Sequence, residues 1–303
     1  MASIESLIVA NYSFTLIIVG TVLNATTLLI LSRPRFRNTR ARPMLHYMRT
    51  MAILDTFMLY GWNLDHYLTT IQSFYILRYS LVSCKFVSFI SYFAPQSSAW
   101  LRVFVSLDRY LSLSRLHRTW FSNSKHTLMI IACILVILFA LNLHFFLFVC
   151  YYRQNGTISA LSWLYDVYPL WDYVNLGVCN IVPFILMVIF NSGVIYHLII
   201  LRRTTTLQNP RIQHRAISIT LVITTFIFLA MTMPSAIAFA FFSDANDTLL
   251  KFFDSFLYSY YVLSFPLYML TFPEFREECI SIVGLKGWDR RIQPQTQVPL
   301  QTI

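Results

Sequence analysis

Asp55 and Arg102 are charged residues that lie deep inside long apolar stretches of this chain. A charged side chain within a membrane is costly, so such a residue marks a functional site by default. Arg102 precedes Arg109 by two helical turns, roughly 10 Å, and Asp55 lies roughly 9 Å along its own helix from Arg49. Because the two depths agree and a buried ion pair is favoured over a lone buried charge, the sequence predicts that Asp55 and Arg102 pair. The alternative is that Arg102 extends toward the nearer membrane surface.

The length of the stretch from Cys84 to Arg109 predicts that it crosses a membrane. It is mostly apolar and ends in Asp108-Arg109-Tyr110. As a helix it would be roughly 37 Å long, and the hydrocarbon core of a bilayer is about 30 Å thick. Cys84 and Arg109 would therefore lie at opposite faces of the membrane.

Seven apolar stretches position these side chains. The chain has 303 residues, of which 57% are hydrophobic and 12% charged, whereas soluble domains carry about 25% charged residues. Each stretch reaches the roughly 20 residues that cross a bilayer: Ile8–Leu31, Met44–Thr70, Val82–Leu113, His126–Val149, Pro169–Leu201, Ile212–Phe242 and Leu249–Phe272. The sequence thus predicts an all-α membrane protein with a seven-helix bundle. We expect one domain over residues 1–284 and a short, disordered polar tail over residues 285–303.

The basic residues give the bundle a direction. With the N-terminus outside, most of the 23 Lys and Arg fall in the inner loops, at their edges and in the tail, as the positive-inside rule requires. The net charge of +10 is therefore spread over short loops, which argues against nucleic acid as a partner. Glycosylation acceptors at Asn11, Asn155 and Asn246 then lie outside, although such tripeptides also occur by chance. Cys84 and Cys150 fall at outer edges, where we expect a disulfide between them.

Short motifs occur in order along the stretches. They are Gly20-Thr21-Val22-Leu23-Asn24, Leu54-Asp55, Cys84, Ser98, Asp108-Arg109-Tyr110, Pro183, Pro234, Ser264-Phe265-Pro266-Leu267-Tyr268 and Phe272-Pro273-Glu274-Phe275-Arg276. Together they resemble the motifs of rhodopsin-like (class A) G-protein-coupled receptors, over about Ile8 to Val283. The resemblance implies a plasma-membrane receptor that transmits an extracellular ligand signal to a heterotrimeric G protein.

The sequence departs from the family pattern at several positions. Thr232 stands where the sixth span usually has a tryptophan, and Asn191 where the fifth usually has a tyrosine. Ser264 replaces an asparagine, the proline after it is displaced by one position, and the fourth span lacks the family's tryptophan. We interpret the chain as a divergent branch to which the family's switch mechanism does not transfer in detail.

The resemblance implies a coupling switch at the inner end of the third span. In the family, Arg109 would pair with Asp108 in the inactive state and contact the G protein in the active state. Tyr110 and Tyr268 belong to the same group of motif residues. The alternative for Arg109 is simple anchoring at the membrane interface, because arginine snorkels readily.

The resemblance also implies a polar network within the membrane. Asn24, Asp55 and Ser98 match positions of that network, and family members hold a sodium ion between the aspartate and the serine. Arg102 lies one turn from Ser98. We therefore interpret the Arg102 guanidinium as a substitute for sodium.

Acidic and aromatic residues gather near the outer ends. They are Asp65, Tyr92, Phe93, Trp171, Asp172, Asp254, Tyr258 and Tyr261. Aromatic walls with a few polar groups suit a ligand pocket, and carboxylates favour a cationic ligand such as a peptide with an arginine or an amidated end. For any single residue, a solvated loop acid or a helix-packing ring is the preferred reading. Ser91 stands where amine receptors carry an aspartate, and Lys251 lies too far outward for a light receptor.

An apolar stripe follows Tyr268. Phe272, Phe275, Cys279, Ile282 and Val283 recur at helical spacing, which predicts a short amphipathic eighth helix at the membrane interface. Cys279 is either a palmitoylation site or an unmodified thiol.

Other functions find little support in the sequence. A transporter or channel is the alternative function, and it would need a polar path or broken helices in related halves. An enzyme would need spacings such as His-Glu-x-x-His, which the sequence lacks. We expect neither catalysis nor a cofactor.

Overall fold

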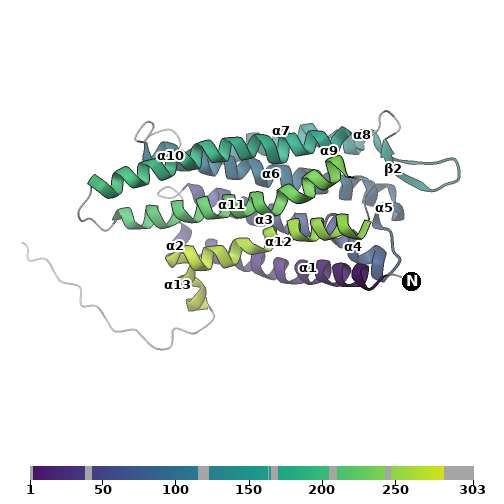
Figure 1. Cartoon of the computed structure of the whole chain (residues 1–303), viewed down its shortest axis with the longest axis horizontal. Coiled ribbons are helices and arrows are strands. Elements are labelled where there is room, and N and C mark those ends of the chain that lie inside the picture. The colour runs from purple at the N-terminus through teal and green to yellow at the C-terminus, as the bar shows by residue number, and fades with distance from the viewer. Residues whose placement is uncertain are drawn as a thin grey trace, which may run out of the picture.

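The computed structural model describes residues 3–37, 43–114, 123–162, 164, 170–204, 210–242 and 247–282. Its long helices are α1 (Ile4–Leu31), α3 (Met44–Leu59), α4 (Trp62–Ile71), α6 (Leu81–Leu113), α7 (Ser124–Asn142), α10 (Val182–Thr204), α11 (Pro210–Phe241) and α12 (Asp247–Thr271). Figure 1 shows them side by side in one elongated bundle. The prediction of an all-α, seven-helix membrane fold is confirmed.

Shorter elements lie at the two ends of the bundle or continue its long helices. They are α2 (Pro34–Arg37), α5 (Ile76–Tyr79), α8 (His144–Leu147), β1 (Val149–Tyr152), β2 (Ile158–Ser162), α9 (Leu170–Asn175), a π-helix (Leu176–Ile181) and α13 (Pro273–Ile282). The antiparallel β1–β2 hairpin lies at one end, and α2 and α13 lie near the other (Figure 1). We call these the disulfide end and the Arg109 end, after the residues of α6 that they contain.

Three predicted stretches differ from single α-helices. The second is divided into α3 and α4 at Tyr60 and Gly61, where a Cβ on Gly61 would lie 2.6 Å from Ser91 Oγ of α6. The fourth ends its long helix at Asn142, and its predicted last residue, Val149, instead begins β1. The fifth contains the π-helix between α9 and α10. π-Bulges within α-helices often mark functional sites.

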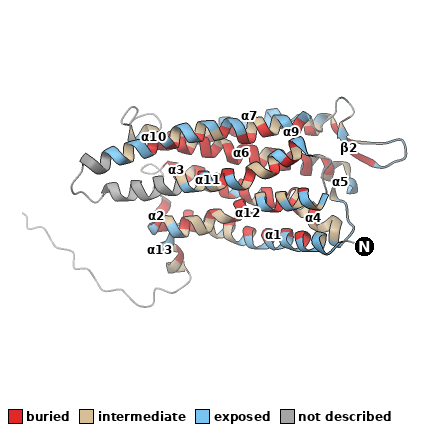
Figure 2. Ribbon diagram, viewed as in Figure 1, coloured by how far each residue is buried: buried red, intermediate tan, exposed pale blue. Residues whose placement is uncertain are grey.

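Four helical stretches among the described residues are long and apolar enough to cross a membrane by length and composition alone. They are Ile4–Leu31, Ser124–Leu147, Leu170–Ile200 and Val222–Phe241. Three of the other long helices contain buried charged residues: Asp55 in α3, Arg102 in α6 and Asp254 in α12. Figure 2 shows α6 largely buried, whereas α1 and α7 expose their outer faces. These charged residues lower the hydropathy of their helices, and they are buried inside the bundle.

The exposed surface of the bundle is apolar where lipid would cover it. Val136 and Ile137 of α7 are 67% and 66% exposed.

Serine and asparagine residues cap the start of several helices, because their side-chain oxygens accept hydrogen bonds from the free backbone N–H groups of the first turn. Ser80 and Ser83 form a capping box at the start of α6, and Asn123 caps α7.

The eighth helix packs against the bundle. Phe275 and Cys279 of α13 are buried in a cluster with Phe36 and Tyr268. Glu277 of α13 accepts a hydrogen bond of 2.8 Å from Arg35, and the nearby pair of Glu278 and Arg33 is 3.8 Å apart. The apolar stripe of the predicted interfacial helix thus contributes to the core at the Arg109 end.

Candidate functional site

A disulfide joins Cys84 and Cys150, as predicted. Cys84 lies in the first turn of α6, and Cys150 lies in β1. Both are buried in a cluster with Tyr92 and Phe145. The bond therefore ties the start of α6 to the β hairpin.

Arg102 and Asp55 are in contact in the middle of the bundle. Arg102 Nη2 lies 3.3 Å from Asp55 Oδ2 and 3.4 Å from Asp55 Oδ1. Arg102 is 7% exposed and Asp55 is 1% exposed. The guanidinium points across to α3, which is the arrangement that the matching depths predict, and not toward a membrane surface.

The other hydrogen bonds of Asp55 come from serine hydroxyls. Ser98 Oγ donates to Oδ1 at 2.7 Å, and Ser264 Oγ donates to Oδ2 at 3.3 Å. A carboxylate offers about four lone-pair positions, and Asp55 receives four contacts from these two hydroxyls and Arg102. The protein itself therefore meets the hydrogen-bonding capacity of this buried carboxylate.

The guanidinium also contacts side chains of α6, α11 and α12. Its Nε donates to the Tyr260 hydroxyl at 2.7 Å, and its Nη1 contacts Ser98 Oγ. Its Cζ lies 5.2 Å from the ring centre of Phe228 and 4.8 Å from that of Tyr260, within the range of cation–π attraction. We call Asp55, Ser98, Arg102, Phe228, Tyr260 and Ser264 the Arg102 cluster.

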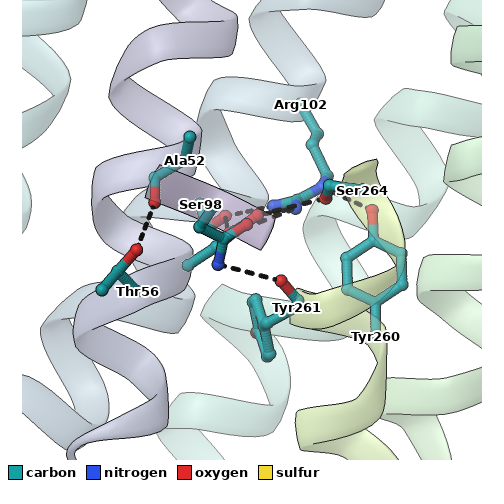
Figure 3. Close-up of polar contacts among 9 residues, drawn as sticks. Ala52, Thr56, Ser98, Arg102, Tyr260, Tyr261 and Ser264 are labelled. Atoms are coloured by element: carbon teal, nitrogen blue, oxygen red, sulfur yellow. Dashed lines mark hydrogen bonds and ion pairs between the residues drawn. The ribbon is translucent and has the colours of Figure 1, made fainter. Parts of the chain in front are cut away.

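The Arg102 cluster joins four helices: α3, α6, α11 and α12. Figure 3 shows the polar contacts around Ser98, Arg102, Tyr260 and Ser264. Sequence reasoning missed Tyr260 and Phe228. A helical signal existed for Tyr260, which precedes Ser264 by four residues and so shares its face of α12. Asn24 lies next to the cluster, since its Nδ2 donates to the backbone carbonyl of Tyr261 at 3.2 Å.

The charged residues Asp108 and Arg109 are buried at the Arg109 end of the bundle. Asp108 and Arg109 are 8% and 7% exposed. The Arg109 guanidinium contacts Met44 Sδ at the start of α3. The Asp108 carboxylate lies within electrostatic reach of Arg109 and of the Tyr47 phenol. The first residues of α3 thus cover the side chains at the end of α6.

Tyr110 turns toward α10. Its ring lies 6.3 Å from that of Phe190 and 5.8 Å from that of His197. A Cβ on Gly193 would lie 2.5 Å from the Tyr110 ring, so glycine permits this close approach. Tyr268 is buried at the same end and makes an edge contact with Phe275 at 5.7 Å.

A cavity of about 50 Å³ lies toward the disulfide end. Of the predicted pocket residues, those that line it are Tyr92, Asp172, Asp254, Tyr258 and Tyr261. The other three predicted residues, Asp65, Phe93 and Trp171, lie outside this lining. Phe93 packs on Phe89 at 5.0 Å, and Asp65 faces the backbone N–H of Ile76.

Hydroxyl groups hold the two carboxylates of the cavity. Tyr92 donates to Asp172 Oδ1 at 3.0 Å, and Ser235 donates to Asp254 Oδ1 at 2.7 Å. His66 Nε2 lies 3.6 Å from Asp254 Oδ2. Both carboxylates are buried, with exposed fractions of 8% and 4% for the two aspartates. The cavity is therefore acidic and enclosed by aromatic rings.

Side-chain amides behind the cavity were not predicted. Asn142 Nδ2 donates to Gln96 Oε1 at 2.7 Å, and Gln96 Nε2 donates to Asn175 Oδ1 at 3.1 Å. Asn175 lines the cavity and is the last residue of α9 before the π-helix. The three amides come from α6, α7 and α9, which are brought together by the fold. No spacing pattern in the sequence could therefore predict their contacts.

The predicted modification sites stand in different surroundings. Asn11 is exposed within α1, Asn155 is exposed at the hairpin, and Asn246 lies outside the described residues. Cys279 is 8% exposed, and burial raises the pKa of its thiol. Palmitoylation of Cys279 and glycosylation of the asparagines remain predictions.

The described part of the chain contains no group of three or more His, Cys, Asp or Glu that could hold a metal ion.

A search of the curated proteins finds no match to the sequence. The family model of the 7 transmembrane receptor (rhodopsin family) matches residues 23–265. This range contains the Arg102 cluster, the disulfide and the Asp108-Arg109-Tyr110 triplet. The chain therefore belongs to the rhodopsin family of seven-transmembrane receptors.

Proposed function

We propose that this receptor binds an extracellular ligand, for which a peptide is our candidate, at the disulfide end and couples to a heterotrimeric G protein at the Arg109 end. The distribution of basic residues supports an orientation in the plasma membrane with the N-terminus outside. The acid-lined cavity and the Asp108-Arg109-Tyr110 triplet lie toward opposite ends of the bundle, and α6 connects them. The receptor acts through conformational change and not through catalysis.

The observation that carries this proposal is that α11 and α12 contribute to both the cavity and the Arg102 cluster. On α11, Thr232 lines the cavity and Phe228, one turn away, lies against Arg102. On α12, Tyr261 lines the cavity and its neighbour Tyr260 accepts from Arg102.

A ligand that shifts α11 or α12 must therefore alter contacts of Arg102. It activates the receptor only if it binds one arrangement of these helices more tightly than the other. We infer that the resting arrangement keeps Arg109 covered by Met44, and that the active one exposes Arg109 to the G protein. Tyr110 and Gly193, where α6 and α10 touch, form part of the contact that must rearrange.

Arg102 takes the place of the sodium ion in this account. Its positive charge already neutralises Asp55, and protein groups already supply the hydrogen bonds to both carboxylate oxygens. A cation that entered would have to displace the guanidinium. The receptor should therefore signal without regulation by sodium.

Nucleotide exchange on purified heterotrimeric G protein tests the proposed function. The receptor in lipid nanodiscs should accelerate exchange when a cationic peptide agonist from a peptide library is added. Arg109→Ala should abolish the acceleration while its surface expression stays normal. Arg153→Ala, at the hairpin, is the matched control and should couple like the parent. Normal coupling by Arg109→Ala would refute the assigned role of Arg109.

A further inference from the structure

The cavity at the disulfide end contains buried hydrogen-bond acceptors that the protein does not satisfy. Among the described residues, Asp254 Oδ2, Asn180 Oδ1 and Ser91 Oγ make no hydrogen bond, and all three residues line the cavity. His66 Nε2 lies 3.6 Å from Asp254 Oδ2, which is too far for a hydrogen bond. A buried acceptor without a donor costs about 1–3 kcal/mol, so this cavity is built to receive donors.

The charge of the cavity has the same sign throughout. Asp172 and Asp254 line it, and the described lining contains neither lysine nor arginine. The hydroxyls of Tyr92 and Ser235 use their protons on these two carboxylates. The formal charge of the lining is therefore negative.

The cavity is also small. Its volume is about 50 Å³, and a single water needs roughly 10–15 Å³ by the same measure. It therefore holds about four non-hydrogen atoms, which is the size of a guanidinium group and far smaller than a peptide. The rest of a ligand would have to lie nearer the mouth of the bundle.

We propose that this cavity binds a single cationic end group of the ligand, a guanidinium or an ammonium, with Asp254 as its main partner. This inference rests on the proposed function, in which the disulfide end receives the ligand. A guanidinium carries five N–H donors and an ammonium carries three, and either would supply the donors that Asp254, Asn180 and Ser91 lack. Hydrogen bonds between such a cation and a carboxylate are roughly twice as strong as neutral ones.

The positions of the acceptors are fixed before any ligand arrives. Ser235 holds one oxygen of Asp254, and Tyr92 holds one oxygen of Asp172. The amides of Asn142 and Gln96 hold Asn175 at the edge of the π-helix. A preformed site loses less entropy on binding, so even a small end group should bind measurably.

Thermal unfolding of the purified receptor, followed by intrinsic tryptophan fluorescence, tests the proposal with three probes. The probes are arginine amide, lysine amide and citrulline amide, each at millimolar concentration. Citrulline amide has nearly the shape of arginine amide but no side-chain charge. At a concentration about tenfold above Kd, arginine or lysine amide should raise Tm by about 3 °C, and citrulline amide should leave it unchanged. The larger of the two cationic shifts identifies the preferred end group.

Two variants locate the site. Asp254→Asn keeps the shape of the side chain and should remove the shift. Asp65→Asn is the matched control, because Asp65 is an acid of the same end that does not line the cavity, and it should keep the shift. An equal shift with citrulline amide, no shift with either cationic probe, or a shift that survives in Asp254→Asn would overturn the proposal. The comparison of probes on the parent protein holds even if Asp254→Asn does not fold.

The readout separates this inference from the proposed function. Probe binding is measured without a G protein, so a receptor that binds arginine amide but stimulates no exchange would count against the function alone. A receptor that stimulates exchange with a neutral agonist, yet shows no cationic shift, would count against the end-group site alone.

Discussion

Asp55 and Asp254 are buried carboxylates of the same bundle, 1% and 4% exposed, but their surroundings differ. Asp55 faces Arg102 at 3.3 Å and accepts from two serines. Asp254 accepts from Ser235 through one oxygen. Its other oxygen makes no hydrogen bond with the described residues and lies 3.6 Å from His66 Nε2. The protein therefore supplies a cation to Asp55, whereas one oxygen of Asp254 lacks a hydrogen-bond donor among the described residues.

In our proposal, the Asp55 carboxylate has a structural role and the Asp254 carboxylate binds the ligand. Removing one partner of a buried ion pair is strongly destabilising, because a charge is left buried alone. A functional site instead carries strain or unmet polar groups at some cost in stability. We therefore expect the Arg102 cluster to stabilise the bundle, and the cavity to gain its missing interactions only on binding.

The largest expected effect is the loss of Arg102. Arg102→Met leaves Asp55 buried without a cation and should lower the free energy of unfolding by about 3–5 kcal/mol, measured by unfolding in mixed micelles. Arg78→Met is the control, because Arg78 lies exposed over the Tyr75 ring at 5.1 Å, and it should cost at most about 1 kcal/mol. Equal costs for the two variants would show that Arg102 is not held by a buried pair.

A second prediction compares the two carboxylates directly. Asp55→Asn should cost about 2–3 kcal/mol, because it weakens charged hydrogen bonds and leaves Arg102 without its counter-ion. Asp254→Asn should change stability by less than about 1 kcal/mol in the absence of ligand, or increase it. Unfolding of both variants under identical conditions provides the test. The opposite order would mean that the cavity carboxylate has a structural partner and that the comparison is wrong.

A smaller effect is the coupling between the two partners. The double variant Arg102→Met with Asp55→Asn should be more stable than the sum of the single changes predicts, by about 1–3 kcal/mol. The same cycle between Arg102 and Asp254 should give a coupling below about 0.5 kcal/mol, because these residues share no contact among the described interactions. Additive effects in the first cycle would contradict the pair.

Much of the fold could be predicted from the sequence because membrane helices have a length and a hydropathy that short-range patterns reveal. The seven stretches, the disulfide and the contact of Asp55 with Arg102 followed from spacing, cysteine position and depth. The break at Gly61, the π-helix and the β hairpin could not be predicted this way. They depend on how neighbouring helices approach one another, as the Gly61–Ser91 contact shows.

The candidate site was predictable only in part. A single acid or ring near a helix end does not show which way it faces, so Asp65 and Phe93 looked as suitable as Asp254 and Tyr258. Tyr260 and Phe228 escaped notice because an aromatic residue in an apolar helix has no distinguishing pattern. Their role appears only when the fold places their rings against a guanidinium.

The most direct test of the Arg102 cluster is the effect of sodium on the purified receptor. We predict that Tm and agonist affinity are the same in sodium chloride and in choline chloride at equal ionic strength. In Arg102→Leu, which leaves Asp55, Ser98 and Ser264 without the guanidinium, sodium should raise Tm relative to choline. A sodium effect on the parent receptor that disappears in Asp55→Asn would contradict the account, because it would place a sodium ion where we place Arg102.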